Sequence, residues 1–252
     1  MAQTPKLKFD ALNALRRYTQ WISFSVDADK LRSLDVDAAI AEAREFFDSF
    51  DKVDTSTIDE ATGTPKLPEG TVVRGVYDVS SLRPEANFMI WWHAQEMETI
   101  QESFHQFKNT ALGRCSTVFW SGTGHHEPSE FNKSHLPTFI KGEDGRDWVS
   151  VYPFVRSYDW YLLDANDRRR ILLEHGSAGR KYPDVLPNTV SAFSLGDYEW
   201  MLAFECDDLH QIVELMHQMR YTDARLHVRE EIPFHTGRRV DPGELVARLA
   251  GK

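Results

Sequence analysis

A dense group of aromatic, cationic and imidazole side chains lies between residues 152 and 182. The stretch reads Tyr152-Pro153-Phe154-Val155-Arg156, then Trp160-Tyr161, then His175-Gly176 and Gly179-Arg180-Lys181-Tyr182. It therefore combines an oxidisable phenol, further aromatic rings, guanidinium cations and an imidazole within about thirty residues. These groups suit a large, flat, anionic redox cofactor better than a sugar, a nucleotide or a protein partner.

The first candidate for metal chemistry in this stretch is His175. It follows Ile171 by four residues and Leu172 by three, so a helix would place it beside apolar neighbours in its last turn. A neutral imidazole can hold haem iron, and the adjacent Gly176 would let the backbone approach a flat macrocycle. A buried histidine bonded to a carbonyl, or a protonated histidine at a helix C-terminus, explains the same spacing.

Tyr152 is the candidate redox residue, because a phenol can be oxidised to a radical or can bind a carboxylate. Arg156 follows it by four residues, so both side chains lie on one face of a regular strand. Arg156 and Arg220 are candidate carboxylate partners, since a guanidinium can bind a carboxylate through two parallel hydrogen bonds. A half-buried strand tyrosine and solvated surface arginines are the alternative interpretations.

His135 lies in the long connection of residues 122–146, which is rich in Gly, His, Pro and charge. A neutral histidine above an iron could remove a proton from peroxide as a general base. An exposed loop histidine is the alternative. Trp160 and Trp200 are expected either to pack in the core or to line the edge of a porphyrin.

The elements that must position these residues follow the order β-α-β-β-α-β twice. Polarity and periodicity predict a polar arm at 1–12 and a loop at 55–70. Strands are expected at 15–26, 71–79, 87–93, 116–121, 147–155, 189–195, 199–205 and 226–234. Helices are expected after the N-caps Asp35, Asp164 and Asp208 and over residues 97–107. Gly176 is expected to end the helix that begins at Asp164.

This order predicts an α+β fold of two tandem ferredoxin-like units, at residues 1–130 and 131–252. The helices of each unit cover one face of its sheet, so the other face needs a partner. The two sheets are expected to cover each other in a dimeric-α+β-barrel-type subunit, with a ligand pocket between sheet and helices.

Composition limits the classes of function. A net charge of −10 without a basic cluster argues against a general nucleic-acid binder. The two cysteines, Cys115 and Cys206, form no CxxC spacing, which argues against a zinc ribbon and fits a reducing compartment. We see no secretory signal and no apolar run of roughly 18 residues, so we expect a cytoplasmic protein that does not enter a membrane.

Taken together, these motifs resemble the chlorite dismutase-like superfamily, and within it the actinobacterial type of coproheme decarboxylase. The sharpest stretches are Tyr152-Pro153-Phe154, residues 160–163 and residues 175–182. Asp197-Tyr198-Glu199-Trp200 and Met219-Arg220-Tyr221 add to the resemblance, which spans most of the chain.

The resemblance implies hydrogen peroxide-dependent oxidative decarboxylation of two propionates of iron coproporphyrin III (coproheme) to vinyl groups, giving haem b. His175 would be the proximal iron ligand, His135 would deprotonate peroxide, and a radical on Tyr152 would take hydrogen from a propionate. The residues that would bind the porphyrin are Arg156, Arg220, Trp160 and Trp200. A homopentamer and transient contact with a coproporphyrin ferrochelatase are also implied.

Two departures separate this chain from the Firmicutes branch of the family. Phe154 and Arg156 stand where that branch has Met and Lys, and residues 185–193 hold no clear counterpart of its distal Gln. Chlorite dismutases use a distal Arg in the same region, and none lies between Lys181 and Trp200, which disfavours a further alternative, a chlorite-decomposing enzyme or a generic peroxidase with an α+β barrel. A haem carrier or sensor is a further alternative, and an oxidisable Tyr152 distinguishes the enzyme from it.

Overall fold

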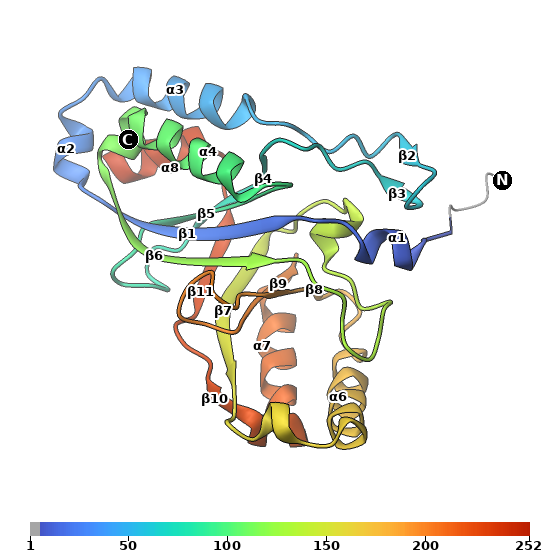
Figure 1. Cartoon of the computed structure of the whole chain (residues 1–252). Coiled ribbons are helices and arrows are strands. Elements are labelled where there is room, and N and C mark those ends of the chain that lie inside the picture. The colour runs from blue at the N-terminus through green and yellow to red at the C-terminus, as the bar shows by residue number, and fades with distance from the viewer. Residues whose placement is uncertain (1–5) are drawn as a thin grey trace.

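The structure is a computed structural model, and it describes residues 6–252. Two β-α-β-β-α-β units follow one another along the chain (Figure 1). The first contains β1 (Tyr18–Val26), α3 (Val36–Asp48), β4 (Val72–Asp78), β5 (Phe88–Ala94), α4 (Met97–Asn109) and β6 (Ser116–His125). The second contains β7 (Trp148–Arg156), α6 (Ala165–Gly179), β8 (Leu186–Ser191), β9 (Trp200–Cys206), α7 (Leu209–Gln218) and β11 (His235–Arg239).

The strands of both units form one closed antiparallel barrel. The sheet order is β10-β7-β11-β4-β5-β1-β6-β8-β9, and β7 also pairs with β9, which closes the ring. Short β10 (Val228–Glu230) attaches only to the end of β7. The units join where β11 meets β4 and where β6 meets β8 through His125 and Ser191. The predicted α+β fold of two ferredoxin-like units in a barrel-type subunit is therefore confirmed, and closure removes free sheet edges.

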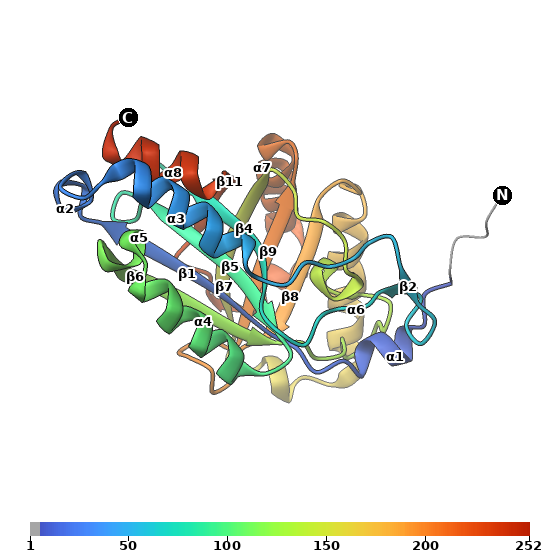
Figure 2. The ribbon, with the colours of Figure 1, turned by 90° about the horizontal axis from the view of Figure 1, so that it is seen from above.

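Helices cover the outside of the barrel in two groups. Over the first unit, α3, α4 and the C-terminal α8 (Pro242–Ala250) lie across the strands (Figure 2). Their apolar faces bury a cluster that includes Phe24, Phe88 and Phe107. The barrel interior holds a second cluster with Trp21 and Trp91. Over the second unit, α6 and α7 bury a smaller cluster, which leaves room beside the sheet.

The predicted N-caps are confirmed. The Asp35 carboxylate accepts from the backbone N–H of Ala38, and Asp208 accepts from that of His210. Asp164 caps α6 in the same way. These bonds satisfy amide groups that have no partner within the helix, and so they determine where each helix begins.

Several expected boundaries are wrong. Helix α6 continues through Gly176 to Gly179, because its packing outweighs the small propensity cost of one glycine. The expected polar arm contains α1 (Phe9–Asn13), whose Leu12 is fully buried. The expected loop at 55–70 contains a short hairpin of β2 (Ile58–Asp59) and β3 (Thr64–Pro65).

The end of the chain also differs from expectation. The last barrel strand is β11 rather than residues 226–234, since Pro233 has no N–H to offer a strand ladder. Helix α8, which the periodicity analysis did not identify, packs against α3 of the first unit. Within residues 6–252, no helix has the length and apolar content needed to cross a membrane.

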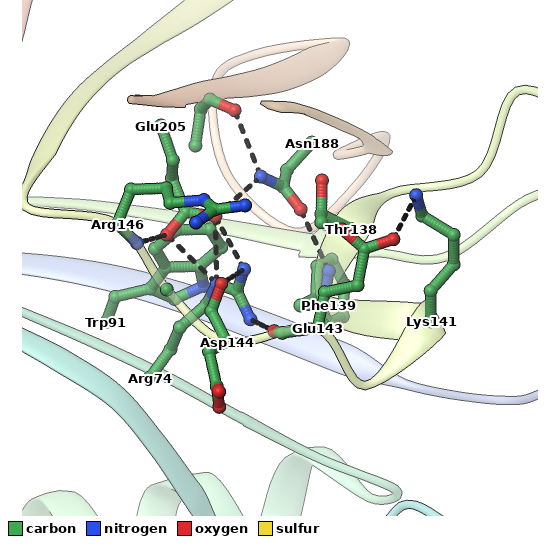
Figure 3. A network of polar contacts seen from close by, with 12 residues as sticks. Arg74, Trp91, Thr138, Phe139, Lys141, Glu143, Asp144, Arg146, Asn188 and Glu205 are labelled. Atoms are coloured by element: carbon green, nitrogen blue, oxygen red, sulfur yellow. Dashed lines mark hydrogen bonds and ion pairs between the residues drawn. The ribbon is translucent and has the colours of Figure 1, made fainter. Parts of the chain in front are cut away.

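The connection between the units is held by a buried ion pair (Figure 3). Arg74 of β4 donates from Nη2 and Nε to Glu205 Oε2 of β9, at 2.7 and 3.0 Å. Arg74 Nη1 also donates to the Glu143 carbonyl at 2.7 Å. Asn188 of β8 donates to the same Glu205 oxygen at 3.1 Å and accepts from the Phe139 N–H at 3.1 Å. The segment that follows His135 is thereby bound to both units.

Three histidines are buried away from the cavity described below. Burial lowers the pKa of His93 well below its ordinary value, and His126 and His235 should likewise make the fold sensitive to acid. Burial lowers the pKa of His126 and of His235 to about 4, from an ordinary value near 6.5. Below pH 6.5 the unfolded chain therefore binds protons that the folded chain refuses, so stability falls as the pH falls towards 4. We expect each histidine to remove about 3 kcal/mol from the free energy of unfolding by pH 4.

Urea unfolding at pH 7, 5.5 and 4.5 measures this loss. His235→Gln is the matched variant, because it removes one of the three groups and should make the pH dependence less steep. A free energy of unfolding that stays constant from pH 7 to 4.5 would contradict the expectation.

Candidate active site

A large cavity lies between the outer face of the second unit's sheet and its covering helices. It encloses about 1280 Å³ of empty space, including the mouth that opens to solvent. All seven residues that the sequence singled out line it: His135, Tyr152, Arg156, Trp160, His175, Trp200 and Arg220.

Strand alternation brings two of these residues together. On β7, Val151 points into the barrel core, whereas Tyr152 and Arg156 line the cavity. Neighbouring β9 follows the same rule, with Met201 inside the barrel and Trp200 in the cavity. The prediction that Tyr152 and Arg156 share a strand face is confirmed.

His175, near the end of α6, is arranged as a neutral metal ligand. Its Nδ1 lies 3.4 Å from Thr222 Oγ1, and the Thr222 hydroxyl donates its proton to the Met219 carbonyl at 3.1 Å. The threonine oxygen must therefore accept from Nδ1–H, which leaves the Nε2 lone pair free for a metal. Burial, with smaller effects of Arg156 and His135, lowers the pKa of His175 to about 4.

Tyr152 is a buried phenol with an aromatic setting. Its ring stacks on Phe234 at 4.6 Å and tilts against Phe204 at 6.1 Å. Burial raises the pKa of Tyr152 far above its ordinary value, and the Glu231 charge raises it further against the opposing effect of Arg220. Because its pKa is raised, the phenol keeps its proton in the free protein, and its hydroxyl has no hydrogen-bond partner among residues 6–252.

Arg156 provides a positive charge in the cavity that forms no ion pair among the described residues, while the Glu199 and Glu130 charges act on it from a distance. Its guanidinium lies 4.0 Å above the Trp160 ring and 4.4 Å above the Phe154 ring. Burial lowers the pKa of Arg156 to about 10, so the group stays charged at neutral pH. In the described part of the chain no carboxylate pairs with it, which makes it a site for a ligand anion. Trp160 is itself buried, so it both packs and forms a wall.

Arg220 is already engaged by a carboxylate that sequence reasoning missed. Its Nη1 and Nη2 reach Glu231 at 3.2 and 3.0 Å, and Arg225 reaches the same carboxylate at 2.7 Å. All three line the cavity, and together they carry one net positive charge. A ligand carboxylate would therefore share Arg220 with Glu231 rather than meet a free cation. The sequence spacing did not predict the pair of Arg220 and Glu231, because the turn before β11 brings these two residues together.

Trp200 belongs to a second polar network that sequence reasoning missed. Its Nε1 donates to the Tyr161 hydroxyl at 3.0 Å, and that hydroxyl donates to Glu199 Oε2 at 3.0 Å. Burial, with a smaller effect of Glu199, raises the pKa of Tyr161 to about 12. The sequence did contain a hint of this network, because Tyr161 follows Trp160 directly and Glu199 precedes Trp200 directly.

His135 lies on the connection between the units and lines the cavity, where part of the residue stays open to solvent. Burial of the imidazole beside the cavity, and to a smaller extent the charge of Lys141, lowers the pKa of His135. A neutral imidazole is thus present at neutral pH, and a neutral imidazole can accept a proton. The chemistry of the lining fits a porphyrin iron, since it offers one free imidazole nitrogen, flat aromatic walls and an unpaired guanidinium.

Known proteins resemble this chain in sequence and in fold. A family model described as chlorite dismutase matches residues 37–240. The coproheme decarboxylase of Mycolicibacterium smegmatis is 49% identical and covers 97% of this chain and 99% of its own. A mutant chlorite dismutase from Candidatus Nitrospira defluvii superposes with a TM-score of 0.76 at 20% identity, over 96% of this chain and 98% of that one. A second mutant of that enzyme, in complex with cyanide, gives 0.76 at 19% identity over 99% and 100%.

Proposed function

This chain belongs to the chlorite dismutase family, and from that premise we propose that it is a coproheme decarboxylase. It would convert two propionates of iron coproporphyrin III to vinyl groups with hydrogen peroxide and release haem b. The 49% identity to the Mycolicibacterium smegmatis enzyme, along nearly all of both chains, supports this substrate. The structural observation that carries the proposal is that a free imidazole nitrogen and a buried phenol, His175 and Tyr152, line one cavity together with flat aromatic rings and an arginine.

Each residue has a task that follows from its surroundings. His175 Nε2 would hold the iron, and Thr222 fixes the tautomer that makes this nitrogen available. Arg156, and Arg220 in competition with Glu231, would bind propionate carboxylates. A bound porphyrin iron would supply the redox chemistry that uses hydrogen peroxide as an oxidant, because the side chains of this protein have no such chemistry of their own. His135 would accept the proton that peroxide loses.

Tyr152 would connect that oxidant to the substrate. Each propionate must lose CO₂, one proton and two electrons to become a vinyl group, and one hydrogen peroxide accepts those electrons to give two waters. Tyr152 would pass on its phenolic hydrogen and then take a hydrogen atom from the propionate β-carbon. Its burial against Phe234 excludes water that would quench such a step.

The test mixes the purified protein with coproheme, titrates hydrogen peroxide and follows the porphyrin mass. We expect two successive losses of CO₂ plus two hydrogens per porphyrin. Bleaching without any decarboxylated product would rule out the proposal.

Replacing His175 with alanine should remove the axial ligand. We expect haem binding to weaken by at least roughly 10–100-fold, the range seen when a ligand loses only its hydrogen-bond partner. Absorbance titration measures the affinity, and resonance Raman spectroscopy detects the iron–imidazole stretch, which added imidazole should restore. Thr222→Val is the matched control, because it keeps the imidazole and removes only the hydroxyl that accepts from Nδ1 and donates to the Met219 carbonyl, so it should cost less. An unchanged iron–histidine stretch in His175→Ala would show that another residue binds the iron.

Four further expectations rest on the family resemblance or the sequence alone, and we propose them on that basis. They are a cytoplasmic location, a homopentameric assembly, transient contact with a coproporphyrin ferrochelatase, and a division into units at residues 1–130 and 131–252. Light scattering coupled to size-exclusion chromatography tests the assembly, since five copies of this 29.1 kDa chain are easily told from one.

A further inference from the structure

Two tyrosines line the cavity, and their hydroxyl groups have different surroundings. Tyr152 is 4% exposed, and within residues 6–252 nothing accepts its hydroxyl proton. Tyr161 is 46% exposed, and its hydroxyl donates to Glu199 Oε2 at 3.0 Å. Trp200 donates to the same hydroxyl at 3.0 Å, so the phenol oxygen is held from both sides.

This difference decides which phenol is easier to oxidise. A neutral phenol that loses an electron becomes a strong acid, so its oxidation needs a nearby base. Glu199 is such a base for Tyr161, and the backbone N–H of Arg156 fixes the same carboxylate oxygen at 2.9 Å. Among residues 6–252 no base is hydrogen-bonded to Tyr152, and Glu231 acts on it only through its charge, so Tyr152 gains a hydrogen-bonded proton acceptor when a ligand carboxylate lies beside it.

We propose that Tyr161 is a second redox-active phenol, which supplies electrons to the porphyrin iron when no reactive propionate lies at Tyr152. This inference rests on the proposed function, because the oxidant is hydrogen peroxide at a bound porphyrin iron. Tyr152 then oxidises only a correctly placed substrate, while Tyr161 removes the oxidising equivalents that would otherwise damage the protein and the porphyrin.

The step is balanced within the network. The Tyr161 O–H bond breaks, the proton moves to Glu199, and the electron goes to the oxidant, leaving a neutral phenoxyl radical. The ring is partly exposed, so a small one-electron donor such as ascorbate or a phenol can return the electron while Glu199 returns the proton. Two such turnovers and two further protons from solvent reduce one hydrogen peroxide to two waters. The inferred activity is therefore that of a peroxidase towards small reductants.

The test locates the radical rather than measuring turnover. Protein loaded with haem b is mixed with one equivalent of hydrogen peroxide, freeze-quenched and examined by electron paramagnetic resonance, with and without ring-deuterated tyrosine. We expect a tyrosyl signal that falls at least about tenfold in Tyr161→Phe and persists in Tyr152→Phe. Glu199→Gln keeps a hydrogen-bond acceptor but removes the base, and a positioned base contributes roughly 10²-fold or more, so the signal should fall there too.

Tyr158→Phe is the matched control. This tyrosine lies three residues earlier, is 81% exposed and contacts Arg229 rather than the cavity, so its loss should leave the signal unchanged. A tyrosyl signal that survives Tyr161→Phe, or the lack of any such signal in the parent protein, overturns the inference. The proposed function is tested separately: it fails if the porphyrin mass in a coproheme sample does not fall after hydrogen peroxide is added. Absorbance spectra confirm that each variant binds haem b.

Discussion

Tyr152→Phe should bind coproheme like the parent protein and form no vinyl product. Phenylalanine keeps the ring that stacks on Phe234 and fills the same buried volume. Only the hydroxyl is lost, and within the described residues it has no hydrogen-bond partner, so folding and binding lose little. The decarboxylation rate should fall by at least about 10³-fold, equivalent to about 4 kcal/mol, because the group that takes hydrogen from the propionate is gone.

Two measurements separate binding from chemistry in this variant. Absorbance titration gives the coproheme dissociation constant, and mass spectrometry after peroxide addition gives the product. Tyr158→Phe serves again as the control, since it removes an exposed phenol outside the cavity. Vinyl formation at the parental rate in Tyr152→Phe would exclude this phenol from the reaction. If the parent protein bound coproheme without decarboxylating it, the haem carrier or sensor would be favoured instead.

Local rules made much of the site predictable. The period of two along a strand placed Tyr152 and Arg156 on one face, and the cavity lies on that face. Aspartate caps located α3, α6 and α7, and the repeated element order gave the barrel. The caps and the strand alternation depend on interactions within a few residues of one another, so the sequence pattern contains them, whereas the barrel followed from the order of the elements.

Tertiary contacts decided what the pattern did not show. The Thr222 partner of His175 and the Glu231 partner of Arg220 come from short 3₁₀ turns and the segment before β11, which have no strong periodicity. Strand β11 is polar in sequence and becomes a strand through pairing with β7 and β4. Helix α8 buries its apolar residues against the first unit, which is far from it in the sequence. The roles of the seven site residues and the boundary at residue 130 stay predictions.

The Arg74–Glu205 pair should account for the largest single effect on stability. Its side chains are 5% and 0% exposed, so Glu205→Ala leaves a buried guanidinium without a counter-charge. Asn188 and the Arg146 N–H lose their acceptor at the same time. We expect a loss of about 3–5 kcal/mol in the free energy of unfolding, as for other broken buried pairs. Glu244→Ala breaks an exposed pair with Arg248 and should cost at most about 1 kcal/mol.

Urea unfolding of the two variants, compared with the parent protein, measures both effects. The double replacement Arg74→Met with Glu205→Leu removes both charges and should recover part of the loss, because no buried ion is left unpaired. Recovery should be incomplete, since the Glu143 carbonyl loses the donor that Arg74 provides. The same pair holds the connection that bears His135, so amide exchange at residues 138–147 should accelerate in Glu205→Ala before global unfolding. Equal losses in Glu205→Ala and Glu244→Ala would mean that the buried pair does not hold the two units together.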